Sequence, residues 1–330
     1  AMKIQLMIFV TLVLMHGHHR INAFVWVIAM SIGFYGIKGG VFTAITGGQY
    51  LVMGPWDSFI TDNNTLALAL IMVLPLMRYL MVVSTGKNVR RFLLLSMILT
   101  TMAIASTHSR GALLAGAVIL LFLIVKSPYR ARFLVVASVA VAGVLLFMPD
   151  VWWERMGTIA NYQQDASAMG RINAWMFAFN VASDFPLTGG GFNVFDEQLF
   201  LQYAPNPTDF HDAHSSYFEV LGEQGFVGLS LFLLLGILTY LSCSRVIRMS
   251  RDHEELTWAR DLASMLQVSL VGYAAGGAFL GLAYYDLYYN LIALSVLLDY
   301  HVRNELAEEP AEVEDPVDSG IAVAPTAPLQ

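Results

Sequence analysis

The sequence predicts an all-helical membrane protein in which about nine transmembrane helices carry one large polar loop. Of its 330 residues, 57% are hydrophobic and 13% are charged, and the mean hydropathy is +0.60. Soluble domains are about 45–50% apolar and about 25% charged, so this composition excludes an ordinary soluble protein. Several apolar runs approach the roughly 20 residues with which a helix crosses a bilayer. The predicted fold class is therefore polytopic transmembrane α.

Nine apolar stretches separated by polar turns are the predicted spans. They cover residues 2–15, 21–37, 65–83, 92–108, 111–125, 133–148, 226–243, 262–280 and 285–300. The first stretch lacks the cationic start and the cleavage site of a signal peptide, and we expect a longer protein in which further spans precede it. We assign residues 1–302 to one transmembrane domain. Residues 303–330 are rich in Pro, Ala and Glu and hold seven carboxylates, which predicts an acidic disordered tail.

The Lys and Arg residues predict which loops face the cytoplasm, because positive charges concentrate in cytoplasmic loops. One set of alternate loops carries twelve of them: Arg20, Lys87, Arg90, Arg91, Lys126, Arg130, Arg132, Arg245, Arg248, Arg251, Arg260 and Arg303. The opposite set carries five: Lys3, Lys38, Arg110, Arg155 and Arg171. We therefore expect residues 149–225 to lie outside the cytoplasm and the acidic tail to lie inside it.

The polar loop at residues 149–225 is the longest polar interruption between apolar stretches. It contains ten carboxylates and no lysine, and its arginines are Arg155 and Arg171. Its histidines are His211 and His214. Because ionisable side chains gather here, we expect the chemistry of the protein in this loop. The single cysteine, Cys243, excludes a disulfide framework and a thiolate metal site.

Two arginines are candidate anion contacts, and each has a structural alternative. Arg110 lies in a short turn on the same outer side, where it either anchors a span at the interface or grips a lipid phosphate through its planar guanidinium. Arg171 begins a predicted helix at residues 170–180, and Phe185-Pro186 ends that helix. The Arg171 guanidinium either serves the site or pairs with one of the loop carboxylates.

The stretch at residues 209–223 holds the remaining candidates. Asp212 is a candidate N-cap, which would place His214 and Tyr217 on one face of a helix and Glu219 on another. Three interpretations of its histidines remain open: a metal site of His211, Asp212 and His214, a structural histidine paired with a carboxylate, or a general base. The order of these residues does not match the HExxH signature, which disfavours the metal site.

Several short motifs together resemble the O-antigen ligase/polymerase superfamily of bacterial inner-membrane glycan transferases, the WaaL-like and Wzy-like proteins. Across roughly residues 90–245 they are Ser109-Arg110-Gly111-Ala112, Gly170-Arg171-Ile172, Pro186-Leu187-Thr188-Gly189-Gly190-Gly191-Phe192, Ala213-His214-Ser215-Ser216-Tyr217 and Glu223-Gln224-Gly225-Phe226-Val227-Gly228. Residues 34–42 and 62–70 resemble one branch of the superfamily, the O-glycosylation ligases associated with exosortase A systems. Ser215 stands where the family usually has Asn, and family members usually have more spans.

The resemblance implies transfer of a glycan from an undecaprenyl-pyrophosphate carrier to a hydroxyl of a glycan, lipid or protein acceptor. It implies a site on the periplasmic side of the inner membrane, with membrane lipid as a partner, and no nucleic acid, cofactor or metal. Arg110 and Arg171 would neutralise the departing pyrophosphate, and His214 would accept the proton of the acceptor hydroxyl. We assign further substrate contacts to Tyr217, Glu219, Arg155 and His211.

Two other functions fit parts of this pattern. A Wzy-like polymerase, which joins repeat units from two lipid carriers, would use the same residues. A transporter or flippase for lipid-linked glycans would instead carry paired charges near the middle of its spans. The predicted spans are almost free of such charges, which favours the transferase, and the resemblance to the exosortase-associated branch favours a ligase.

Overall fold

The computed structural model describes residues 2–126, 130–157 and 166–308, and within these ranges every regular element is a helix. The helices are α1 (Met2–Leu14), α2 (His18–Thr46), α3 (Asn63–Val83), α4 (Lys87–Ser106), α5 (Arg110–Lys126), α6 (Arg130–Phe147), α7 (Asp150–Gly157), α8 (Ala166–Asp184), α9 (Glu197–Tyr203), α10 (Ser216–Met249), the short 3-10 helix η2 (Glu254–Leu256), α11 (Thr257–Gly276) and α12 (Asp286–Glu308). The all-helical prediction is confirmed.

Each of the nine predicted spans coincides with a helix, namely α1 to α6 and α10 to α12. Four of these helices, α2, α3, α4 and α10, are long and apolar enough to cross a membrane by length and composition. Others are shorter than the roughly 20 residues that cross a bilayer, since α1 has 13 residues and α5 has 17. The structure therefore supports a membrane protein, and the number of spans stays a prediction.

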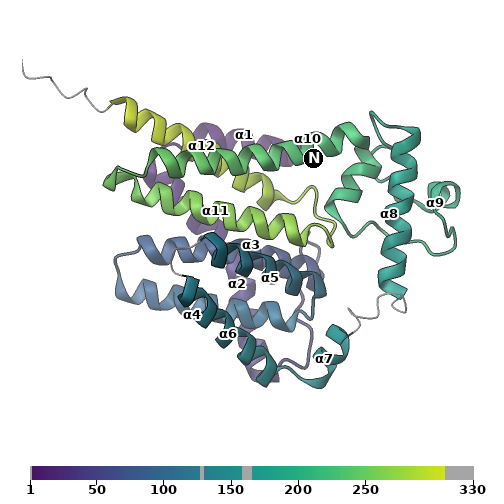
Figure 1. The fold of residues 1–330 in the computed structure, drawn as a ribbon, viewed down its shortest axis with the longest axis horizontal. Helices are drawn as coiled ribbons and strands as arrows, with labels where there is room; N and C mark the ends of the chain where they lie inside the picture. Colours follow the sequence, from purple (N-terminus) through teal and green to yellow (C-terminus); the bar gives the residue numbers. More distant parts are fainter. Residues whose placement is uncertain (1, 127–129, 158–165, 309–330) are drawn as a thin grey trace, which may run out of the picture.

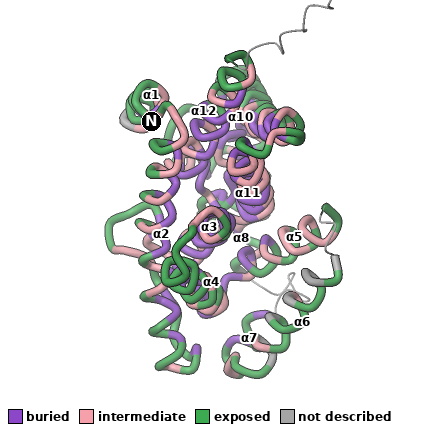
Figure 2. The backbone as a smooth tube through the Cα atoms, turned by 90° about the vertical axis from the view of Figure 1, so that its left-hand side faces the viewer, coloured by how far each residue is buried: buried purple, intermediate pink, exposed green. Residues whose placement is uncertain are grey.

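Helix α3 forms the centre of the bundle. It packs against α2, α4, α5 and α11. In its most apolar stretch of 18 residues 72% are buried, whereas in the corresponding stretch of α10 only 11% are buried. Figure 2 shows the buried backbone concentrated in the middle of the bundle. Close packing of α2 on α4 depends on Gly40, where a Cβ atom would overlap the backbone of Leu99. The outward apolar face of α10 is suited to contact lipid.

Among its described residues, the predicted polar loop holds α7, α8 and α9, which lie at one end of the bundle (Figure 1), and the first residues of α10. Helix α8 packs against α10. Behind this contact lies a small apolar core that includes Phe177, Val181, Val194 and Phe200. The predicted helix at residues 170–180 is confirmed and extends over Ala166–Asp184. Because this segment has its own core, it can hold side chains in fixed positions at the end of the bundle.

A break in α10 receives the glycine-rich turn that follows α8. Gly225 has φ 67° and ψ −169°, a backbone conformation that essentially only glycine adopts. Beside the break, Phe226 N donates to Pro186 O at 2.9 Å and Gly190 N donates to Gly222 O at 2.9 Å. The glycines of this turn therefore serve close backbone packing between α8 and α10.

Replacing Gly225 with alanine is expected to lower the free energy of unfolding by roughly 1–3 kcal/mol. The new Cβ atom would lie 2.6 Å from Pro186 O and 2.9 Å from Gly189 N, so the turn would have to move. Thermal unfolding of the purified protein in detergent measures the effect. Gly116→Ala in α5 is the matched control, because no atom lies within 4 Å of its added Cβ. Equal melting temperatures for the two variants would contradict the expectation.

The C-terminal helix extends beyond the predicted transmembrane domain. Helix α12 continues to Glu308, although the acidic tail was predicted to begin at residue 303. Two side-chain pairs at i, i+4 spacing stabilise this end: Arg303 Nε lies 2.9 Å from Asp299 Oδ2, and His301 Nε2 lies 3.7 Å from Glu305 Oε1. The rest of the predicted tail, residues 309–330, lies outside the described residues.

Candidate functional site

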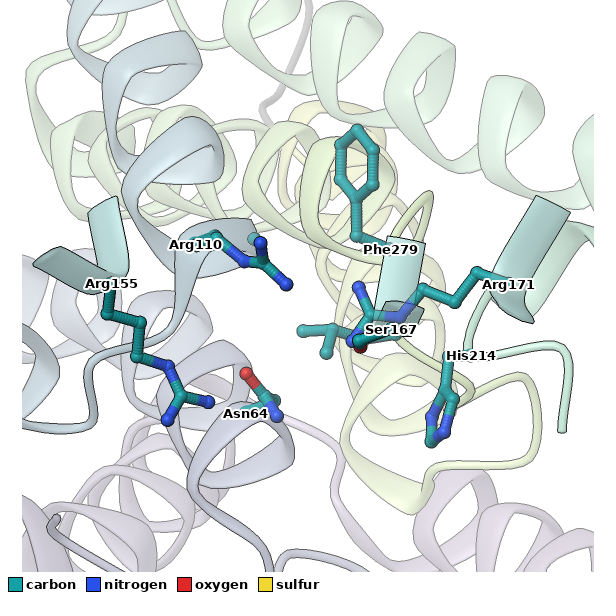
Figure 3. A pocket seen from close by; sticks show the side chains of 9 residues that line it. Asn64, Arg110, Arg155, Ser167, Arg171, His214 and Phe279 are labelled. Atoms are coloured by element: carbon teal, nitrogen blue, oxygen red, sulfur yellow. The ribbon is translucent and has the colours of Figure 1, made fainter. Parts of the chain in front are cut away.

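A pocket of about 230 Å³ lies between the bundle and the polar segment. It is lined by Asn64, Arg110, Gly111, Arg155, Ser167, Arg171, His214, Phe279 and Leu280. These residues come from α3, α5, α7, α8, the segment before α10 and the segment between α11 and α12. The structure thus brings the three predicted catalytic residues, Arg110, Arg171 and His214, to one pocket (Figure 3). We call it the cationic pocket.

Arg110 is held at the first position of α5 by a hydrogen-bonded turn. The Ser109 hydroxyl accepts a hydrogen bond from Ala112 N at 3.2 Å, and Asn63 Nδ2 donates to Thr107 O at 2.7 Å. These bonds tie the turn to the start of α3. Because Arg110 stands at a helix N-terminus, the positive end of the helix dipole adds to the charge of its guanidinium. This end of α5 favours an anion.

Arg171 reaches the pocket from α8, on the side opposite Arg110 (Figure 3). The residue before it must be small, because a Cβ atom on Gly170 would lie 2.6 Å from the His211 ring. Arg155 extends from α7, which Trp152 holds against the end of α4 by donating to Ala105 O at 3.1 Å. Three arginines from three helices therefore line one pocket.

The electrostatics of the cationic pocket favour an anionic ligand with more than one charge. Among the described residues that line it, none is a carboxylate. Three guanidinium groups that line one pocket contribute positive potential there, which attracts an anion. Guanidinium groups pair bidentately with phosphate oxygens. The arrangement of Arg110, Arg155 and Arg171 is thus suited to a diphosphate.

His214 lies in the segment before α10 rather than on a helix. Its φ is 41°, in the left-handed region that L residues rarely adopt. Trp175 of α8 fixes this segment, because its Nε1 donates to Ala213 O at 2.7 Å and its ring stacks on Phe218 with centroids 4.9 Å apart. The prediction that Asp212 caps the helix is wrong. The left-handed conformation of His214 is not helical, and α10 begins only at Ser216.

The pKa of His214 is lowered from its ordinary value of 6.5. Desolvation in the pocket is the main cause, and the positive charge of Arg171 adds to it, while Asp212 and Asp62 act in the opposite direction. The imidazole is nevertheless accessible from the pocket. A lowered pKa keeps it neutral at pH 7, which is the form that accepts a proton.

The other predicted contacts lie outside the lining of the pocket, apart from Arg155. Tyr217 donates its hydroxyl hydrogen to Ala274 O at 2.7 Å, and Glu219 Oε2 accepts a hydrogen bond from Ala283 N at 3.2 Å. Tyr217 therefore ties α10 to α11, and Glu219 ties α10 to the chain between α11 and α12. His211 Nδ1 lies 3.1 Å from Asp209 Oδ1, as the structural interpretation predicts. Among the described residues, no group of three or more His, Cys, Asp or Glu side chains is arranged to hold a metal.

Sequence reasoning assigned no role to several residues that line the pocket. Asn64 follows the N-cap Asp62, whose carboxylate accepts hydrogen bonds from Asn64 N at 2.8 Å and Thr65 N at 3.2 Å. Asp62 can be recognised as an N-cap from the sequence, but the sequence does not show that Asn64 lines the same pocket as Arg110. Phe279 and Leu280 fell within a predicted span, so their apolar side chains carried no signal.

Two parts of the chain match known families. Residues 95–233 match a family model described as O-Antigen ligase, and residues 2–85 match one described as a family of unknown function (DUF5935). A comparison with curated proteins finds no match. The first match contains the three arginines and the histidine of the cationic pocket, and the second contains Asn64. The match over residues 95–233 supports a relation of this part of the chain to the O-antigen ligase family, which suggests a glycosyltransferase-like enzyme.

Proposed function

We propose that the protein transfers a glycan from an undecaprenyl-pyrophosphate carrier to an acceptor hydroxyl at the periplasmic membrane face. The observation that carries the proposal is the convergence of Arg110, Arg155, Arg171 and His214 on one pocket. A pyrophosphate supplies the multiple negative charge that such a pocket favours, and a histidine in its neutral form supplies the base.

The size of the pocket fits the reacting end of the donor. Pockets that enclose a whole small ligand are about 300–1,000 Å³, whereas the cationic pocket is about 230 Å³. It accommodates the pyrophosphate and the first sugar, so the polyprenyl chain and the rest of the glycan extend beyond it. The lipid chain lies in the bilayer, and the glycan lies on the aqueous side.

The transfer step follows from these positions. The acceptor oxygen attacks the anomeric carbon, and the bond from that carbon to the pyrophosphate oxygen breaks. Arg110 and Arg171 stabilise the negative charge that develops on the leaving pyrophosphate. His214 accepts the proton of the acceptor hydroxyl and later releases it to solvent. Attack opposite the leaving group inverts the configuration of the anomeric carbon.

A ligase and a polymerase differ in the acceptor, and the cationic pocket serves both. A flippase for lipid-linked glycans is the rival from another class, because its substrate carries the same pyrophosphate. It needs no general base, so His214 beside the arginines favours the transferase. The resemblance of the N-terminal motifs to the exosortase-associated branch favours a ligase.

Purified protein is expected to transfer the glycan of an undecaprenyl-pyrophosphate donor to an acceptor in the presence of EDTA, because the arginines neutralise the pyrophosphate. The assay scores which acceptor is modified and how long the product is. A single transfer to a different acceptor supports the ligase, and repeated growth of the glycan supports the polymerase.

Two outcomes would contradict the proposal. Transfer that stops in EDTA and returns with magnesium would show that the arginines are insufficient. Movement of the donor across a liposome bilayer without transfer in any assay would support the flippase. The Gly116→Ala protein, purified in the same way, is the control for activity lost during preparation, because no atom lies within 4 Å of its added Cβ.

A further inference from the structure

We propose that residues 54–61, between α2 and α3, form a saccharide-binding loop beside the cationic pocket, in which Trp56, Asp57 and Phe59 bind a sugar ring of the glycan. We call this segment the aromatic loop. The proposal rests on the proposed function, which supplies a glycan as substrate. The aromatic loop would hold the glycan at a distance from the bond that reacts.

The aromatic loop presents its rings at the protein surface. Trp56 is 92% exposed and Phe59 is 61% exposed. An open hollow of about 510 Å³ is lined by Trp56, Asp57, Ser58, Phe59 and Thr61. Aromatic faces combined with a few polar groups are the usual lining of sites for small organic ligands. The loop therefore has both parts that a sugar ring requires.

Hydrogen bonds within the loop hold this surface in place. Gly54 N donates to Thr61 O at 2.9 Å and closes the loop. The hydroxyls of Ser58 and Thr61 lie 2.8 Å and 2.9 Å from Pro55 O, to which both donate. Asp57, at the tip, has a left-handed φ of 56°. A preorganised surface loses little conformational entropy when a ligand binds.

The chain before the aromatic loop is attached to the turn that carries Arg110. Val52 N donates to Ser106 O at 3.0 Å, and His108 Nε2 donates to Gly48 O at 3.0 Å. His108 is itself buried. The aromatic loop is therefore held at the same end of the bundle as the cationic pocket.

The chain after the aromatic loop enters the cationic pocket directly. Asp62 caps α3, and Asn64 lines the pocket (Figure 3). Asn64 stands five residues after Phe59, so their Cα atoms are at most about 18 Å apart. A glycan whose first sugar lies in the pocket can therefore reach the aromatic loop with its later sugars.

The charge of this segment favours a saccharide over the membrane surface. Residues 47–62 contain Asp57 and Asp62 and no Lys, Arg or His. Anionic lipid headgroups attract Lys and Arg, so a segment with only carboxylates is repelled. A sugar ring presents C–H groups that pack on an aromatic face and hydroxyls that donate to a carboxylate. The loop thus complements the cationic pocket, which takes the pyrophosphate.

A binding experiment tests the aromatic loop independently of transfer. The probe is the oligosaccharide released by mild acid from the undecaprenyl-pyrophosphate donor, which lacks the phosphates. Saturation-transfer NMR on the full-length protein in nanodiscs measures its Kd. Trp56→Ala is expected to weaken binding by about 3- to 10-fold, and Trp56→Phe is expected to retain most of it. Phe9→Ala is the matched control, because Phe9 is 67% exposed on α1.

Two further measurements follow. The first distinguishes the loop proposal from the proposed function, and the second distinguishes the donor glycan from a saccharide acceptor as the ligand of the loop. His214→Ala should bind the phosphate-free probe like the wild type while it loses transfer. Intact probe binding by a wild-type protein that transfers no glycan would overturn only the proposed function. In the transfer assay, Trp56→Ala should raise KM with little change in kcat. A raised KM for the donor assigns the loop to the donor glycan, and a raised KM for a saccharide acceptor assigns it to that acceptor.

Unchanged probe binding in Trp56→Ala would overturn the proposal. Quenching of Trp56 fluorescence by brominated lipids in phosphatidylethanolamine/phosphatidylglycerol vesicles would also overturn it, because the loop would then lie in the bilayer. The Trp56 signal is the difference between the wild-type and Trp56→Phe proteins.

Discussion

Replacing His214 with alanine is expected to lower kcat for glycan transfer by about 10²–10⁴-fold, the range of general-base catalysis. The acceptor hydroxyl must lose its proton as it attacks, and His214 is the histidine that lines the cationic pocket. Because the ring is accessible, its removal leaves no buried group without a partner, so the melting temperature should stay close to that of the wild type. Radiolabelled donor glycan measures the rate.

The pH dependence gives the same residue a second test. Desolvation and Arg171 lower the pKa of His214 below 6.5, so the proton-accepting form persists as the pH falls to that value. The rate constant kcat/KM should therefore fall only below pH 6.5, as the histidine of the free enzyme becomes protonated. This acidic decline should be missing from the residual activity of His214→Ala. A decline that survives in the variant would assign the titration to another group.

His211→Ala is the matched control for the histidine. His211 belongs to the same segment, but its ring lies against Gly170 and its Nδ1 lies 3.1 Å from Asp209 Oδ1. We expect this variant to lose less than 10-fold in kcat, because general-base catalysis would remain. Wild-type transfer by His214→Ala, or a larger loss in His211→Ala, would contradict the assignment of the base.

The helices could be predicted from the sequence because hydropathy is a local property. Each of the nine predicted spans coincides with a helix, and the helix predicted to follow Asp212 is the first part of α10, which begins at Ser216. The part of α10 before Gly225 includes the apolar residues Phe218, Val220 and Leu221, and it packs against α8 and the chain between α11 and α12. The left-handed conformation of His214, after which the helix begins, leaves no periodic signal in the sequence.

The site was predictable in its residue types more than in its geometry. Charge, position and the family resemblance selected Arg110, Arg171 and His214, and the structure brings them to one pocket. Their convergence depends on the hydrogen bonds that hold a turn near Arg110 and on a left-handed residue at His214. Neither feature has a compositional signal. The sequence likewise gives no sign that the Tyr217 hydroxyl bonds to the backbone of α11, and Tyr217 was therefore predicted to contact substrate.

Replacing either Arg110 or Arg171 with alanine is expected to lower kcat by about 10²–10³-fold, the typical loss when one group that stabilises a developing negative charge is removed. The leaving pyrophosphate gains charge as its bond to the sugar breaks, so the loss should be larger in kcat than in donor affinity. The two guanidinium groups reach the pocket from opposite sides (Figure 3). In the proposed step each acts on the pyrophosphate and not on the acceptor. The KM for the acceptor should therefore stay nearly constant.

Lysine substitutions separate charge from geometry at these positions. Lysine keeps the positive charge but lacks the planar fork that pairs with two phosphate oxygens, so Arg171→Lys should recover only part of the loss. Arg155→Ala provides the comparison within the pocket. Arg155 is the most exposed of the three arginines, so its substitution should lower kcat by less than 10-fold. In the double variant of Arg110 and Arg171, the losses should combine to less than their product, because both groups act on one pyrophosphate. Full activity in Arg171→Ala would remove the pyrophosphate contact from the mechanism, and full activity in Arg171→Lys would show that charge alone suffices.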